Sequence, residues 1–131
     1  MIHDEICTYE VCKLAKEKGF PQDVFGTCEM KSSCYLEDGR YYKDGCIYPI
    51  ENAYSAPAQG LLQRWLREEK GLCVSVEAYP TLALMGNVCF AWVIKSNSNG
   101  SFMESNDSLL TFDTYELALE DALKYALENL I

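Results

Sequence analysis

The chain has 131 residues, of which 49% are hydrophobic and 24% charged, a composition that is ordinary for one globular domain. Its net charge is −9 and no basic patch is visible, which disfavours binding to the phosphate backbone of nucleic acids. No apolar run approaches the roughly 18 residues that a membrane-spanning helix needs. The acidic segment 1–5 lacks the hydrophobic region of a secretory signal. We therefore expect a cytoplasmic protein that contacts neither nucleic acid nor membrane.

Seven cysteines are many for a chain of this length. An odd number of cysteines without an export signal argues against a disulfide framework, so we expect reduced thiols. Cys28, Cys34 and Cys46 fall in a loosely patterned region, but they lack the paired spacing of a zinc site. The sequence therefore predicts neither a bound metal nor another cofactor.

The first predicted element is a helix from Asp4 to Lys18. Acidic residues at its start and lysines at its end suit the helix dipole. Gly19, followed by Pro21, is placed to end the helix. Four residues at helical spacing form its apolar side: Cys7, Val11, Leu14 and Ala15.

Residues 21–54 contain one clear local signal, which is a β-hairpin. Short strands at Ser32–Leu36 and Tyr41–Lys43 flank Asp38-Gly39, a dipeptide that favours a tight hairpin turn. The region is also rich in tyrosine, and such residues either form an exposed contact surface or cover a core. The sequence leaves both readings open. The candidate contact residues here are Tyr35, Tyr41, Tyr42 and Tyr48.

The stretch Ser55–Gly71 reads as a complete helix around which the rest of the chain is organised. Pro57 suits the first helical position, Ser55 the cap, and Gly71 a left-handed end. Trp65 lies in the middle of the apolar stripe, so we expect it to be buried against a sheet. Its replacement by alanine should then cost about 3–5 kcal/mol. The stripe consists of Ala58, Leu61, Leu62, Trp65 and Leu66.

Two arginines on the same helix are further candidates for a contact surface. Arg64 and Arg67 flank Trp65 and could bind an anion or a protein partner. The alternative for Arg64 is an ordinary surface ion pair with Glu68, four residues further along the helix.

The last part of the chain predicts three strands and a helix. Leu72–Tyr79 alternates as a half-buried strand, Val88–Lys95 is apolar on both faces and should be central, and Ser101–Glu104 is a short third strand. Asp113 is placed to cap the last helix, with Glu116 completing a capping box. The helix has an unbroken apolar stripe: Tyr115, Ala118, Leu119, Ala122, Leu123, Ala126, Leu127 and Leu130.

These elements predict an α+β fold, in which an antiparallel sheet of three or more strands packs against helices. We expect residues 1–131 to form a single domain. Residues 1–54 would form its N-terminal helix and hairpin region, and residues 55–131 a helix–strand–strand–strand–helix core.

The order of elements in the core resembles that of the double-stranded-RNA-binding domain, but only in topology. Such domains place lysines at the start of the last helix to reach phosphates. This sequence has Asp113, Tyr115 and Glu116 there, which would repel them. Fold alone does not carry function.

Three segments carry a second resemblance. They are Lys13–Phe20, Ser55–Pro57 with Leu61–Glu68 (SAP followed by LLQRWLRE), and Phe112–Glu120 (FDTYELALE). In these segments the chain resembles a group of small uncharacterised proteins of gut anaerobic bacteria and their phages or mobile elements. The resemblance implies a cytoplasmic protein from such an element, and it implies no activity.

No catalytic motif stands out, so we do not expect an enzyme. The single histidine, His3, lies near the terminus, and no phosphate-binding loop or metalloprotease motif is present. We expect a small non-enzymatic protein-interaction module, a monomer or small homo-oligomer, with a protein partner. The alternative is an acidic nucleic-acid mimic that inhibits a host nucleic-acid-binding protein.

Overall fold

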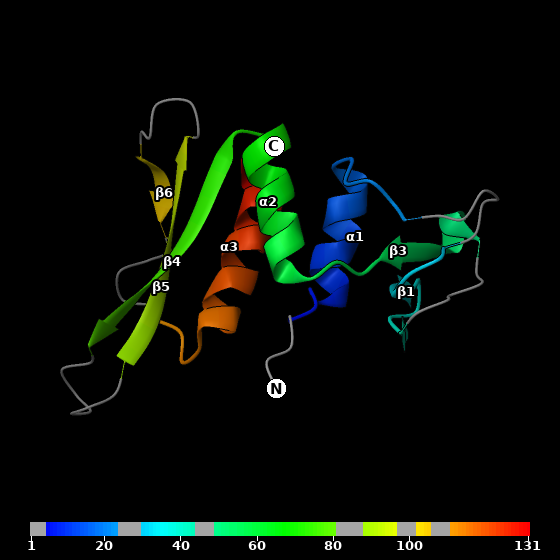
Figure 1. Ribbon diagram of the computed structural model, residues 1–131, viewed down its shortest axis with the longest axis horizontal. Helices are drawn as coiled ribbons and strands as arrows, with labels where there is room; N and C mark the ends of the chain where they lie inside the picture. The colour runs from blue at the N-terminus through cyan, green and yellow to red at the C-terminus, as the bar shows by residue number, and fades with distance from the viewer. Residues whose placement is uncertain (1–4, 24–29, 44–48, 81–87, 97–101, 106–110) are drawn as a thin grey trace. The chain divides into compact units, whose positions relative to one another are not determined.

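The computed structural model describes residues 5–23, 30–43, 49–80, 88–96, 102–105 and 111–131 (Figure 1). These residues form three α-helices and two three-stranded antiparallel sheets, which confirms the predicted α+β class. The chain divides into two compact units, Met1–Ala58 and Gln59–Ile131. That residues 1–131 form a single domain stays a prediction. None of the helices in the described ranges has the length and apolar character needed to span a bilayer.

Helix α1 of the first unit, Tyr9–Glu17, begins later than predicted. The Thr8 side chain accepts a hydrogen bond from the Val11 amide at 3.4 Å and caps the helix there. The residues just before Thr8 lie outside the helix, and the Cys7 amide donates to the Pro57 carbonyl at 2.9 Å. The predicted end is confirmed, because Gly19 adopts a φ of +96°, in the region that favours glycine.

The predicted hairpin is confirmed as strands β1 (Cys34–Leu36) and β2 (Tyr41–Tyr42). Gly39 supplies the turn with a φ of +90°. The sequence did not predict β3 (Ala53–Ser55), which follows the 3₁₀ turn η1 (Ile50–Asn52) and pairs with the other edge of β1. The sheet order is therefore β2-β1-β3. One of its faces buries a small core of Met30, Cys34, Leu36 and Ala53.

Helix α2 of the second unit, Gln59–Glu69, begins two residues after the predicted position of Pro57. Ser55 cannot cap it, because Ser55 belongs to β3, where its Oγ accepts from the Asp23 amide at 2.9 Å. The predicted end is confirmed by Gly71, which has a φ of +70°.

The buried side of α2 differs from the predicted stripe. Gln59, Leu62 and Leu66 are buried, whereas Leu61 is 54% exposed and Trp65 is only half-buried. The prediction that Trp65 is buried against the sheet is therefore wrong in degree, because part of its side chain is exposed. The buried positions 59, 62 and 66 follow the helical period and place residues 61 and 65 away from the centre of the contact.

Strands β4 (Leu72–Pro80), β5 (Val88–Ser96) and β6 (Phe102–Ser105) confirm the three predicted strands, with β5 in the centre. Helix α2 and helix α3 (Tyr115–Asn129) lie on the same side of this sheet (Figure 1). The strands bury Leu72, Val74, Trp92 and Ile94. Helix α3 buries Ala118, Leu119, Ala122, Leu123, Ala126 and Leu127.

The cap of α3 lies one residue later than predicted. Thr114, rather than Asp113, is the cap, and its Oγ1 accepts from the Leu117 amide at 3.1 Å. Tyr115 and Leu117 at the start of the helix are 41% and 55% exposed, so the apolar stripe begins at Ala118 rather than Tyr115.

The expectation of reduced thiols is wrong at one position. Cys34 is disulfide-bonded. Cys28 and Cys46 lie outside the described residues. Among the described cysteines, Cys7 and Cys12 are buried thiols, and Cys73 and Cys89 are partly exposed thiols.

Candidate functional site

Three tyrosines form a row across the sheet of the first unit. Tyr35 on the central strand β1 lies opposite Tyr41 on β2 and opposite Tyr54 on β3. Directly opposed residues of antiparallel strands project from the same face of a sheet. The neighbouring residues Cys34 and Leu36 are buried in the core on the other face. Strand pairing therefore collects the three rings on one surface.

Helix α1 adds a fourth ring to this row. The Tyr9 ring contacts the rings of Tyr35 and Tyr54 edge-on, with centroids 5.9 Å and 5.8 Å apart. Tyr35 and Tyr41 are tilted against each other at 5.1 Å. Edge-on and tilted arrangements are the favourable geometries for aromatic pairs. We refer to Tyr9, Tyr35, Tyr41 and Tyr54 as the tyrosine cluster.

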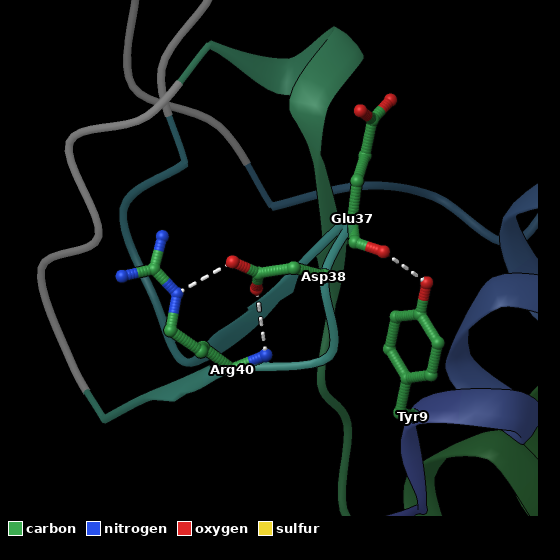
Figure 2. Close-up of polar contacts among 4 residues, drawn as sticks. All are labelled: Tyr9, Glu37, Asp38 and Arg40. Atoms are coloured by element: carbon green, nitrogen blue, oxygen red, sulfur yellow. Dashed lines mark hydrogen bonds and ion pairs between the residues drawn. The ribbon is translucent and has the colours of Figure 1, made fainter.

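Hydrogen bonds from the hydroxyl groups hold two of these rings. The Tyr9 hydroxyl donates to the carbonyl of Glu37 at 2.5 Å, as Figure 2 shows, and the Tyr35 hydroxyl donates to the Cys7 carbonyl at 3.0 Å. Lys16 fixes the far end of the row. Its Nζ donates to the Ala53 carbonyl at 2.9 Å and lies 5.2 Å from the centre of the Tyr54 ring.

The turn between β1 and β2 supplies the charged groups beside the cluster. Asp38 accepts from the backbone amide of Arg40 at 3.0 Å and from its Nε at 2.7 Å (Figure 2). The hydrogen bond from the Arg40 amide is the main cause that lowers the pKa of Asp38, and the Arg40 charge acts in the same direction. The Glu37 carboxylate points away from the other three residues drawn in Figure 2.

Burial within the cluster changes the acidity of Tyr54. Desolvation raises its pKa above the ordinary value, and the neighbouring Tyr9 raises it further. The positive charge of Lys13 lowers the pKa, whereas Glu37 and Glu17 raise it.

The four rings differ in their access to solvent. Tyr41 is 42% exposed, whereas Tyr9, Tyr35 and Tyr54 are half-buried. The cluster thus exposes Tyr41 to solvent at the β2 edge of the sheet, while the other three tyrosines pack against neighbouring residues.

The structure groups only part of the predicted contact set. Tyr35 and Tyr41 lie in the tyrosine cluster, whereas Tyr42 packs against the core on the opposite face. Tyr48 lies outside the described residues. Arg64 and Arg67 belong to the second unit, where Arg64 Nε pairs with Glu68 at 3.0 Å, as the ordinary alternative predicted.

The predicted contact set left out two members of the cluster, Tyr9 and Tyr54, although Tyr54 belongs to the tyrosine-rich region of the sequence. Tyr54 joins it through the pairing of β3 with β1, which are far apart along the chain. Tyr9 joins it from α1, where its spacing carried no sign of a sheet contact. The high tyrosine content of residues 21–54 was the one feature of the sequence that pointed to this cluster.

Three carboxylates among the described residues of the second unit serve as internal acceptors. Gln59 Nε2 donates to Glu120 at 2.8 Å and to the carbonyl of residue 116 at 3.0 Å. Trp92 Nε1 donates to Asp121 at 2.8 Å, and the Tyr125 hydroxyl donates to Glu104 at 2.9 Å. Within the described ranges, no group of three or more His, Cys, Asp or Glu side chains could hold a metal ion.

Comparison with protein-family models, with curated proteins and with solved structures gives no match.

Proposed function

We propose that this protein is a non-enzymatic protein-interaction module and that the tyrosine cluster is its contact surface. The observation that carries the proposal is the exposed Tyr41 ring, which is 42% exposed and packed on Tyr35. Tyrosine supplies a large, amphipathic contact area at a low cost in side-chain entropy. Binding hot spots are enriched in this residue.

The preorganisation of the cluster supports the same proposal. The hydroxyl bonds of Tyr9 and Tyr35 and the contact of Lys16 with Tyr54 hold three rings before a partner arrives. Binding to a surface that is already ordered loses less conformational entropy.

The alternative, an acidic nucleic-acid mimic, has weaker support. A mimic needs a row of carboxylates that faces solvent, because it must replace phosphates. In the second unit Glu104, Glu120 and Asp121 accept internal hydrogen bonds, and Glu128 lies 3.9 Å from Lys124. Direct binding to nucleic acid has no support either, given the net charge of −9.

Location and assembly belong to the same proposal. We propose a cytoplasmic monomer or small homo-oligomer from a phage or mobile element, as the sequence resemblance implies. Disulfides persist mainly in oxidising compartments, so the redox state of Cys34 in the purified protein tests this location.

The test is affinity capture from the native host with three proteins: the wild type, Tyr41→Ala and Tyr79→Ala. Tyr79 is a matched control, because it is 46% exposed and lies outside the tyrosine cluster. We expect one partner whose recovery falls about tenfold with Tyr41→Ala, the effect of removing a hot-spot side chain. Circular dichroism confirms that both variants fold. Equal recovery with all three proteins would remove the tyrosine cluster from the proposal.

A further inference from the structure

We propose that the tyrosine cluster binds a basic segment of its protein partner, with a lysine or arginine side chain against the Tyr41 ring and Glu37 as its counter-ion. The inference rests on the proposed function and adds the chemical class of the partner.

The first argument is that the cluster already binds a cation. Lys16 Nζ lies 5.2 Å from the centre of the Tyr54 ring, at one end of the row. The faces of tyrosine rings attract cations because their quadrupole is negative there. Tyr41, at the other end of the row, is the ring that is open to solvent. It offers the same chemistry to a cation from outside the molecule.

The second argument is the charge beside the row. Glu37 lies beside the row, because its backbone carbonyl accepts from the Tyr9 hydroxyl, and its exposed carboxylate points away from Tyr9 and from the Asp38–Arg40 pair (Figure 2). Lys16, in contrast, already donates to the carbonyls of Ile50 and Ala53.

A third argument is that the net charge of −9 favours the approach of a basic partner over an acidic one. Each contact at the cluster should nevertheless be modest, because exposed cation–π and ion pairs are weak individually. A real partner would add further contacts around the cluster.

The experiment is an NMR titration of the isotopically labelled full chain with a decapeptide of alternating lysine and glycine. The same peptide with acetylated lysines lacks the charge and serves as the ligand control. We expect saturable shifts of the Tyr41 and Tyr35 ring signals and of the amides of residues 35–41, with the charged peptide alone. Added salt should weaken them.

Two variants and a matched control test the named residues. Tyr41→Leu keeps an apolar side chain without the ring face and should weaken binding about two- to fivefold. Glu37→Gln keeps the carbonyl that Tyr9 uses and should weaken it about twofold. Glu69→Gln removes an exposed carboxylate of helix α2, outside the cluster, and should leave the dissociation constant unchanged.

Two results would overturn the inference. One is the absence of shifts at the cluster, and the other is shifts that are equal in the wild type, Tyr41→Leu and Glu37→Gln. If Tyr41→Ala still abolishes capture of a partner from the host, the contact surface stands and only the basic class of the partner is wrong. If capture is also unaffected by Tyr41→Ala, the tyrosine cluster is not the contact surface either.

Discussion

At the scale of single residues, hydrogen bonds to carboxylates connect buried side chains to helix α3. Trp92 is 3% exposed, and its indole N–H donates to Asp121 at 2.8 Å. Asp121→Ala leaves this N–H without its acceptor, so we expect a loss of about 1–3 kcal/mol in unfolding free energy. Urea denaturation followed by circular dichroism measures it. Glu128→Ala, on the same helix, removes only an exposed pair and should cost less than about 0.5 kcal/mol. Equal losses would contradict the role of Asp121.

The pair of Tyr125 and Glu104 makes a prediction about pH. The hydrogen bond to Glu104 raises the pKa of Tyr125, and desolvation adds to it. A raised pKa means that the pair's contribution to stability is complete below the unfolded pKa of about 10. The contribution is lost as the pH rises through the folded pKa.

We expect Glu104→Gln to lower the pKa of Tyr125 towards the ordinary value, as measured by NMR of ¹³C-labelled tyrosine. Glu77→Gln is the control, because Glu77 accepts from Tyr79 and should change the pKa of Tyr79 instead. A Tyr125 pKa that does not move in Glu104→Gln would show that this hydrogen bond is absent in solution.

At the scale of elements, the two faces of α2 give a direct comparison. Leu66 is fully buried, whereas Leu61 is 54% exposed. We expect Leu66→Ala to cost about 2–5 kcal/mol in unfolding free energy and Leu61→Ala less than about 0.5 kcal/mol. Trp65→Ala should fall between these values, because the ring is half-buried and Lys70 Nζ lies 5.3 Å from its centre. Similar costs for both leucines would place the buried face elsewhere.

Local patterns predicted most elements and the ends of the first two helices, but not where the helices begin. Glycines at 19, 39 and 71 marked two helix ends and a turn, because a positive φ is a property of the residue itself. The sequence predicted too early a start for α1. The Thr8 side chain caps the helix, so the helix begins after the acidic residues that were expected to start it. The apolar period alone could not predict the burial of Gln59, which depends on acceptors more than fifty residues away in the chain.

The candidate site was predictable only in part for the same reason. Tyr35 and Tyr41 are neighbours across a hairpin, so their pairing follows from the local Asp38-Gly39 turn. Tyr54 and Tyr9 reach the cluster through long-range contacts that no local pattern encodes. Successive side chains of a strand point to opposite faces of the sheet. Tyr42 directly follows Tyr41, and its side chain therefore packs against the core on the other face.

At the scale of the whole molecule, the state of Cys34 bears on where the protein resides. We expect the peptide that contains Cys34 to react with iodoacetamide only after reduction. The thiols of Cys7, Cys12, Cys73 and Cys89 should react in the denatured protein without reductant. Mass spectrometry of both digests measures this. Alkylation of Cys34 in the unreduced protein would exclude the disulfide and favour a reducing compartment.

The proposal that the tyrosine cluster contacts a protein partner is tested most directly by photo-crosslinking in living cells. Tyr41 is replaced by the photoreactive benzoylphenylalanine in one strain and Tyr79, which is similarly exposed, in another. We expect irradiation to give one discrete adduct from position 41 and none of the same mass from position 79. No adduct at position 41, or the same adduct from both positions, would contradict the proposal.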